Sequence, residues 1–206
     1  MSKNVVIIGA GGHAKVIAEI IIKSGDEVIG FLDDNENIQD IEIYAGKRVI
    51  GKTCDIEKYK DNYFIIGIGK NKIRKRIAEN NNLKWYTAIH PSAIIATDVK
   101  IGAGTVIMPG VIINPGTEIG KHCIINTSSS IDHDNVIENF VHVSPGCHLA
   151  GTVNIKEQNW IGVGAILINN IIIAKNCIIG AGAVVIKDLL EENNTYVGVP
   201  ARKVVK

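Results

Sequence analysis

Aliphatic residues recur at a fixed interval of six along the C-terminal half of the chain. From Ile89 to Ile179 every sixth residue is Ile, Val or Leu, and Val185 continues the phase. Sixteen hexads follow one another without a gap. Neither a helix, with a period of 3.6, nor a plain strand, with a period of 2, produces this spacing. A six-residue repeat is typical of a parallel β-helix, in which each hexad forms one short strand and one corner.

The hexads also have small or β-branched residues at a second position, two residues before each aliphatic one. Thr105, Thr117 and Cys123 are examples, and glycine often follows the aliphatic residue. Small side chains fit at tight corners, and glycine tolerates the positive φ angles found there. Three hexads make one triangular coil, so residues 18 apart are expected to stack. A strand spacing of roughly 4.8 Å predicts a rod about 25 Å long.

The N-terminal part has a different pattern of strands and helices. We expect strands over residues 4–9, 27–32, 63–68 and 83–88, and helices over 14–24 and 72–80. Residues 35–60 look irregular apart from a short strand near 48–51, and residues 187–194 are polar and are expected to leave the rod. The pattern predicts a Rossmann-like α/β half domain over residues 1–85. A parallel β-helix with a C-terminal cap is expected over 86–206.

The first turn of the half domain carries the pattern G-x-G-x-x-A, and the acids Asp33 and Asp34 follow about 20 residues later. Glycines let the backbone approach a phosphate, and a helix N-terminus offers free N–H groups. The pattern favours a mononucleotide or a nucleotide-sugar diphosphate. A dinucleotide such as NAD and a merely structural turn remain alternatives, although the domain is too short for both mononucleotide halves.

Charge is distributed unevenly. The net charge is +1, which argues against a nucleic-acid partner, and only ten of the 43 charged side chains lie in residues 89–184. A narrow rod with so few charges is expected to bury an outer face against another copy of the chain. The N-terminus runs directly into a strand and no apolar run reaches about 18 residues, so neither a signal peptide nor a membrane span is expected.

The cysteines predict little chemistry. Cys123, Cys147 and Cys177 occupy the small corner position of their hexads, and Cys54 has no CxxC partner. We expect buried thiols at these three positions, reduced cysteines throughout, no zinc or other metal site, no cysteine nucleophile, and a cytoplasmic location.

Among the six histidines, His133 has the most suggestive neighbours. It lies between Asp132 and Asp134, and the residue stacked 18 positions later is Gly151, which leaves room for a ligand beside the imidazole. An adjacent carboxylate can fix the tautomer of a histidine and raise its basicity. A solvated surface histidine is the alternative interpretation.

The other five histidines have fewer charged neighbours in the sequence or none. His142 is expected to stack between Ile124 and Trp160, half a coil from His133, so the two would meet more easily across a subunit interface. His148 shares the hexad position of His142. We expect structural roles for His90 and His122. For His13, which lies in the glycine turn, a ligand contact and a structural role remain alternatives.

These motifs together resemble a known family. The turn Gly9–His13 and the Leu-Asp-Asp ending at Asp34 precede a rod that carries Asn126-Thr-Ser, Ile131-Asp-His-Asp134, the segment 142–151 and a closing Val-Gly-Val-Pro-Ala-Arg202. The whole chain resembles the sugar O-acyltransferase group, which includes bacterial nucleotide-linked 4-amino-sugar N-acetyltransferases and sialic acid O-acetyltransferases. The resemblance implies a left-handed β-helix and a homotrimer with acetyl-CoA between adjacent rods.

The resemblance also implies residue roles. His133 would be the general base, Asp134 its orienting carboxylate, His142 a second histidine near the acyl group and Asn126 a substrate contact. The candidate substrate-binding positions are Gly9, Gly11, Gly12, His13, Asp33, Asp34, Gly69 and Asn126. The candidate positions for acetyl-CoA, the expected co-substrate, are His142, Gly151, Ile161, Gly162 and Gly180.

The expected reaction is direct attack of a sugar amino group on the thioester of acetyl-CoA. His133 would remove the proton, and the amide of Gly151 is our candidate donor for the oxyanion. The acceptor is expected to be the 4-amino group of a UDP- or dTDP-linked amino-dideoxy sugar. O-acetylation of sialic acid, an NAD-linked enzyme and a non-catalytic binding protein on a β-helix remain alternatives.

Overall fold

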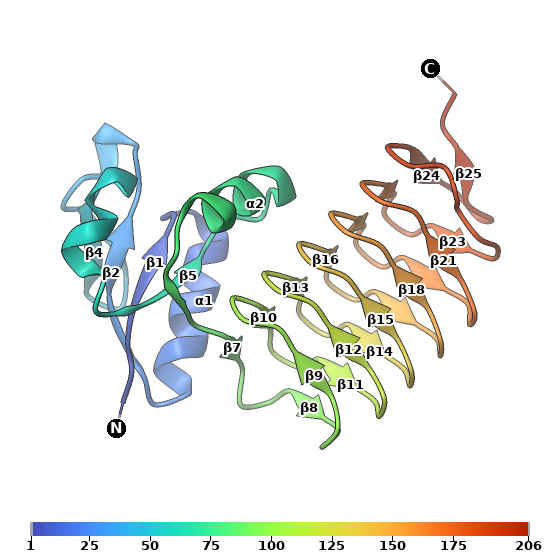
Figure 1. Ribbon diagram of the computed structural model, residues 1–206, viewed down its shortest axis with the longest axis horizontal. Coiled ribbons are helices and arrows are strands. Elements are labelled where there is room, and N and C mark those ends of the chain that lie inside the picture. The colour runs from blue at the N-terminus through green and yellow to red at the C-terminus, as the bar shows by residue number, and fades with distance from the viewer. Residues whose placement is uncertain (1, 206) are drawn as a thin grey trace. The chain divides into compact units, whose positions relative to one another are not determined.

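The computed structural model describes residues 2–205 and divides into two compact units, one ending at Pro91 and one beginning at Ser92 (Figure 1). The division lies six residues after the junction expected from the sequence. Tyr86 and Ala88 are buried, and the Ser24 hydroxyl donates to the Ile89 carbonyl, so this segment belongs to the first unit.

The first unit is built on a six-stranded sheet in the order β3-β4-β2-β1-β5-β6. All neighbouring strands are parallel except β3 and β4. The strands are β1 (Asn4–Ile8), β2 (Glu27–Leu32), β3 (Glu42–Tyr44), β4 (Lys47–Gly51), β5 (Tyr63–Ile66) and β6 (Lys84–Trp85). The helices are α1 (Gly12–Lys23) and α2 (Asn71–Asn80), with 3-10 turns η1 (Glu36–Ile38) and η2 (Thr53–Tyr59). The predicted Rossmann-like half domain is therefore confirmed.

Alternation along β1 places its side chains on two faces of the sheet. Val6 and Ile8 pack in one apolar cluster with Phe64 and with Ile77 of α2. α1 packs on the opposite face. Glycine at position 67 allows this close packing, because a Cβ there would collide with Ile7 of β1 and Ala14 of α1. α1 begins at Gly12, two residues before the expected start, and this places Gly12 and His13 of the glycine turn in its first helical turn.

The second unit is a parallel β-helix in which two-residue strands recur at each hexad. Each strand pairs with the strand 18 residues later, as Ile113 does with Ile131, which confirms the predicted coil of three hexads. The first face contains β10 (Val106–Ile107), β13 (Ile124–Ile125), β16 (His142–Val143), β19 (Trp160–Ile161) and β22 (Ile178–Ile179). The second face contains β8 (Ile94–Ile95), β11 (Ile112–Ile113), β14 (Ser130–Ile131), β17 (His148–Leu149), β20 (Ile166–Leu167) and β23 (Val184–Val185). The third face contains β9 (Lys100–Ile101), β12 (Glu118–Ile119), β15 (Val136–Ile137), β18 (Asn154–Ile155) and β21 (Ile172–Ile173).

Hexad aliphatics from Ile107 onward point into the rod and are buried. At the first coil Ile95 and Ile101 are only half-buried, because no coil lies beneath them. The far end is closed by β24 (Thr195–Val197), which extends the first face, and by the antiparallel β25 (Arg202–Lys203). Contrary to expectation, segment 187–194 does not leave the rod, because the buried Leu189 pairs with Ile173.

The outer faces carry exposed apolar residues. Ile94, Ile112 and Ile166 are exposed on the second face, and Trp160 and Ile178 on the first. Within residues 2–205, no helix has the length and apolar character needed to cross a membrane.

Candidate active site

A corner of the rod carries His133 between β14 and β15. The imidazole Nδ1–H donates to Asp134 Oδ2 at 2.8 Å. This hydrogen bond fixes the neutral tautomer that leaves Nε2 with its lone pair. Asp134 adopts a φ of 58°, and this left-handed conformation, which Asp tolerates better than most residues, turns its carboxylate back toward the preceding ring. The corner therefore holds an oriented imidazole with a free basic nitrogen.

Two carboxylates act on the basicity of His133. The hydrogen bond that His133 donates to Asp134 and the nearby charge of Asp132 raise the pKa of His133 above its usual value. Asp132 Oδ1 in turn accepts hydrogen bonds from the His133 N–H and from Asn114 Nδ2, both at 2.8 Å. Those two hydrogen bonds lower the pKa of Asp132 and keep it ionised. The ring is consequently a stronger base than an isolated histidine.

Gly151 lies against the imidazole in the next coil, as its 18-residue spacing predicts. A Cβ built on Gly151 would come within 2.6 Å of both Cε1 and Nε2 of His133. Glycine is therefore required for the ring to lie here. Among the described residues the Gly151 N–H has no hydrogen-bond acceptor, so a backbone donor lies unused close to the basic nitrogen.

A hollow of about 320 Å³ lies beside this corner on the second face. Asp132 and Ala150 line it on the side of the corner, and Ser130, His148 and Ile166 line the face itself. His148 Nδ1 is 2.7 Å from the Ser130 hydroxyl. The hollow offers polar and apolar surface next to the candidate base, and the hexad position of His148 alone does not indicate that it lines a cavity.

His142 lies on the first face, stacked between Ile124 and Trp160 as expected. Its ring centroid is 4.9 Å from that of Trp160, and its Nε2 accepts from Asn126 Nδ2 at 3.2 Å. The structure thus brings Asn126 and His142 together, but it places them on a different part of the rod from His133. Within one chain the two groups of candidates do not meet.

The remaining candidates for acetyl-CoA binding occupy tightly stacked positions. Ile161 is fully buried, so its side chain points into the rod and only its backbone could contact a ligand. A Cβ on Gly162 would lie 2.5 Å from the carbonyl oxygen of Ile179, and one on Gly180 would lie 2.8 Å from Val197. Coil stacking alone therefore accounts for glycine at both positions.

In the first unit the glycine turn joins β1 to α1. Gly9 has a φ of 98° and packs against Ile68, so this position requires glycine. Gly11 and Gly12 differ, because a Cβ at either position would meet no atom within 4 Å. Gly11 caps α1 without a side chain, and the first-turn N–H groups have no partner within the helix. Open space above free amides suits an anion.

His13 lies in this first helical turn, and its enclosed Nε2 has no hydrogen-bond partner among the residues that the structure describes. Burial, with the positive charge of Arg74 as a second cause, lowers its pKa to about 4. The ring is therefore neutral at pH 7. The buried Arg74 donates to the carbonyls of Ile68 and Gly69 at 3.2 and 3.0 Å, which fixes the turn that contains Gly69.

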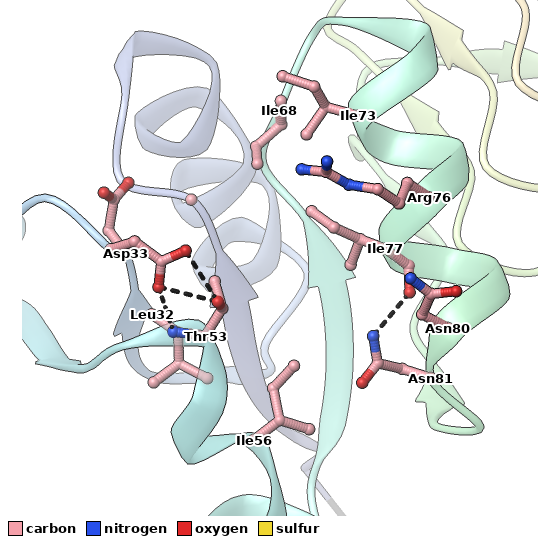
Figure 2. Close-up of a pocket in the computed structure, with 12 residues that line it drawn as sticks. Leu32, Asp33, Thr53, Ile56, Ile68, Ile73, Arg76, Ile77, Asn80 and Asn81 are labelled. Atoms are coloured by element: carbon pink, nitrogen blue, oxygen red, sulfur yellow. Dashed lines mark hydrogen bonds between the residues drawn. The ribbon is translucent and has the colours of Figure 1, made fainter.

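A cavity of about 300 Å³ opens at the carboxyl ends of the strands in this unit (Figure 2). Asp33 accepts from the amides of Ala10 and Asn35 at 2.9 Å, and Asp34 accepts from the amide and hydroxyl of Thr53. Both acids thus shape the cavity wall through these bonds. The carboxyl ends of parallel strands are where open α/β sheets bind ligands.

The opposite wall of this cavity comes from α2. Figure 2 shows the Arg76 side chain extending from α2 toward the strand ends, beside Ile73 and Ile77. Arg76 forms no ion pair with any described residue. Sequence reasoning missed it, because an arginine on an amphipathic helix looks like any solvated surface residue.

No group of His, Cys, Asp and Glu side chains within residues 2–205 could hold a metal ion. Cys123, Cys147 and Cys177 are buried, and burial raises the pKa of the Cys147 thiol to about 11. Thiolate attack by Cys147 is therefore disfavoured.

Comparisons with known proteins match both units. Residues 4–81 match the family described as the PglD N-terminal domain, and residues 98–133 match the bacterial transferase hexapeptide repeats. GDP-perosamine N-acetyltransferase of Escherichia coli O157:H7 is 32% identical over 176 residues, which cover 78% of this chain and 76% of that protein. The chain belongs to the hexapeptide-repeat sugar N-acetyltransferase family.

Solved structures of this family share the fold of the whole chain. PerB from Caulobacter crescentus, in complex with CoA and GDP-perosamine, is 35% identical with a TM-score of 0.91, and the match covers 98% of this chain and 97% of that one. The acetyltransferase domain of PglB from Neisseria gonorrhoeae, in complex with acetyl coenzyme A, is 33% identical with a TM-score of 0.92, covering 99% and 100%. As a member of this family, the chain is an acyltransferase.

Proposed function

We propose that this enzyme transfers the acetyl group of acetyl-CoA to the 4-amino group of a nucleotide-linked amino-dideoxy sugar. The observation that carries the proposal is the corner at His133. An imidazole held by one carboxylate lies against a glycine whose amide has no acceptor among residues 2–205, on a chain that matches GDP-perosamine N-acetyltransferase over most of its length.

The proposed reaction is a direct transfer. The nitrogen of the sugar amino group attacks the thioester carbonyl, and His133 Nε2 accepts a proton from that amino group. The Gly151 N–H donates to the oxyanion that forms. When the C–N bond is complete, the C–S bond breaks, and the thiolate of CoA takes the proton from the imidazolium. No acyl-enzyme forms, in keeping with the burial of Cys123, Cys147 and Cys177 in the rod.

The first unit is proposed to bind the nucleotide. The open amides above Gly11 and Gly12, with the neutral His13 beside them, suit the diphosphate. The cavity lined by Gly9, Asp33, Asp34 and Arg76 is large enough to take a nucleobase and ribose, and the ordered turn at Gly69 lies beside Ile68 at its edge. This unit would hold the acceptor, while the rod carries the chemistry.

Acetyl-CoA is proposed to lie between adjacent rods of a homotrimer. The exposed apolar residues on the faces of the rod, among them Trp160, Ile166 and Ile178, support burial against a second copy. His142 and Asn126 of one chain would then lie near His133 of another. Gly162, Gly180 and the backbone of Ile161 would border the coenzyme. We propose a cytoplasmic location, where acetyl-CoA and nucleotide sugars are available.

The test is mass spectrometry of products from acetyl-CoA and a panel of acceptors. The panel contains GDP-, UDP- and dTDP-linked 4-amino-dideoxy sugars and free sialic acid. The proposal expects one acetyl group on an amino-sugar nucleotide. Acetylation of sialic acid alone would replace it with O-acetylation, and failure to bind CoA in calorimetry would indicate a non-catalytic protein.

A further inference from the structure

Asn135 departs from the composition of the rod corners. It occupies the position two residues before a hexad aliphatic, where small or β-branched side chains such as Thr117 predominate. Its side chain is nevertheless fully buried, two residues after His133. A buried amide is costly unless its donors and acceptor are all satisfied. The hydrogen-bond partners of the Asn135 amide therefore show which backbone segments it fixes in place.

The Asn135 amide bonds two successive coils. Nδ2 donates to the carbonyls of Asp132 at 2.7 Å and Ala150 at 3.0 Å, with a longer contact of 3.2 Å to the carbonyl of His133. Oδ1 accepts from the Val153 N–H at 3.1 Å. Since Nδ2 carries two hydrogens, one serves Ala150 and the other is shared between Asp132 and His133.

The bond to Ala150 has a consequence for Gly151. The Ala150 carbonyl and the Gly151 N–H belong to the same peptide group. In a trans peptide these two groups point in opposite directions. The buried Asn135 draws the carbonyl toward the interior of the rod, so the Gly151 N–H points outward, on the side where the His133 ring lies.

We propose that Asn135 is a positioning residue. It fixes the His133 base and the Gly151 oxyanion donor at the correct positions relative to each other. One hydrogen of its amide holds the peptide that carries His133, and the other orients the peptide that presents the Gly151 N–H. The inference rests on the proposed roles of those two groups. It adds a residue that touches neither substrate and acts from inside the rod.

Corner residues that carry a hydroxyl cannot make this double connection. Thr105 and Thr117 each donate one bond, to the carbonyl 15 residues later, and Ser129 donates one to the carbonyl three residues earlier. A hydroxyl has a single hydrogen, so it reaches one coil or the other. An amide at the corner reaches both.

Asn159 provides a matched control. Its Nδ2 donates to the carbonyls of Lys156 and Ala174, and its Oδ1 accepts from the Cys177 N–H. These partners lie at the same offsets of three, 15 and 18 residues as those of Asn135. Asn159 is also fully buried, but no candidate catalytic group lies on its corner.

The experiment compares Asn135→Ala with Asn159→Ala, using acetyl-CoA and whichever of GDP-perosamine or a UDP-linked 4-amino-dideoxy sugar the enzyme acetylates. Both variants lose similar hydrogen bonds, so similar decreases in Tm are expected. Only Asn135→Ala should lower kcat, by about tenfold to a hundredfold, because small displacements of reacting groups are that costly. KM values should change less than about threefold in both.

A second readout follows the base itself. The NMR signals of the His133 ring are assigned as those that are absent from spectra of His133→Ala. In Asn135→Ala this ring should titrate at a lower pH than in the wild type, because its alignment with Asp134 loosens. Asn159→Ala should leave this titration unchanged. Asn135→Thr keeps one donor for the Ala150 carbonyl and should recover part of kcat.

Equal losses of kcat in the two alanine variants, or a kcat of Asn135→Ala within about twofold of wild type, would overturn the positioning role. Full activity of His133→Ala would instead remove the proposed base. These outcomes separate failure of the positioning role from failure of the proposed function.

Discussion

The rod and the Rossmann-like unit build their candidate sites in opposite ways. In the rod every coil repeats the last, so a site arises only where one hexad departs from its neighbours, as at His133 and Asn135. In the first unit no element repeats, and the cavity forms where several strands end together, between Asp33, Thr53 and Arg76 (Figure 2).

This difference predicts a division of labour. A repeating scaffold holds its backbone through neighbours on both sides, which suits groups that must keep their position during a reaction. Loops at strand ends vary freely and suit recognition of one ligand. Substitutions in the rod should therefore change kcat, and substitutions in the cavity of the first unit should change KM for the nucleotide sugar.

The largest effect should come from His133→Ala. Loss of general-base assistance should lower kcat by about 10²- to 10⁴-fold. The side chain is exposed at its corner, so the fold should survive. Steady-state kinetics with the oligomeric state checked by light scattering tests this, and near-wild-type turnover would remove His133 from the mechanism.

Gly151→Ala should have the second largest effect on kcat. The new Cβ would fall 2.6 Å from the imidazole, so the ring must move while the Gly151 amide remains. We expect a loss of kcat on the order of 10²-fold, typical of a misplacement of about 1 Å. An unchanged oligomeric state in light scattering is the internal control, and an unchanged kcat would mean that the ring has no fixed place in catalysis.

Asp134→Asn should act mainly through pH. The hydrogen bond to Asp134 is the largest cause of the raised pKa of His133, and only the neutral ring can accept a proton. Loss of the negative charge should lower this pKa, so the acid limb of kcat/KM moves to lower pH while the plateau falls about tenfold. Asparagine tolerates the φ of 58° at this position. An acid limb at its wild-type pH would contradict this account.

The smallest effect should arise in the other unit. Arg76→Ala should raise KM for the nucleotide sugar by about threefold to tenfold, since one exposed charged contact is lost, and should leave kcat unchanged. Arg48→Ala is the matched control, because Arg48 pairs with Asp40 and does not line the cavity. A loss of kcat in Arg76→Ala would break the proposed division between the two units.

Much of the rod was predictable because its core follows a strict count. The aliphatic at every sixth position predicted the coil of 18 residues, and from that count followed the placement of Gly151 beside His133 and of Trp160 beside His142. The turn at Gly9 was predictable because few residues other than glycine allow the φ of 98° found there. Arg76 and His148 could not be recognised, because nothing local separates a cavity-lining residue from a solvated one.

By itself the sequence determined the two kinds of architecture, since a period of six and a βαβ pattern each allow one simple way to bury apolar side chains. Only the tertiary structure decided the direction of individual polar groups. That the amide of Asn135 turns the Ala150–Gly151 peptide, and that the end of α2 faces the ends of β1 and β2, depends on hydrogen bonds and packing between segments far apart in the chain. The hexad count does not reveal such contacts, because it fixes where a side chain lies and not which polar groups it bonds.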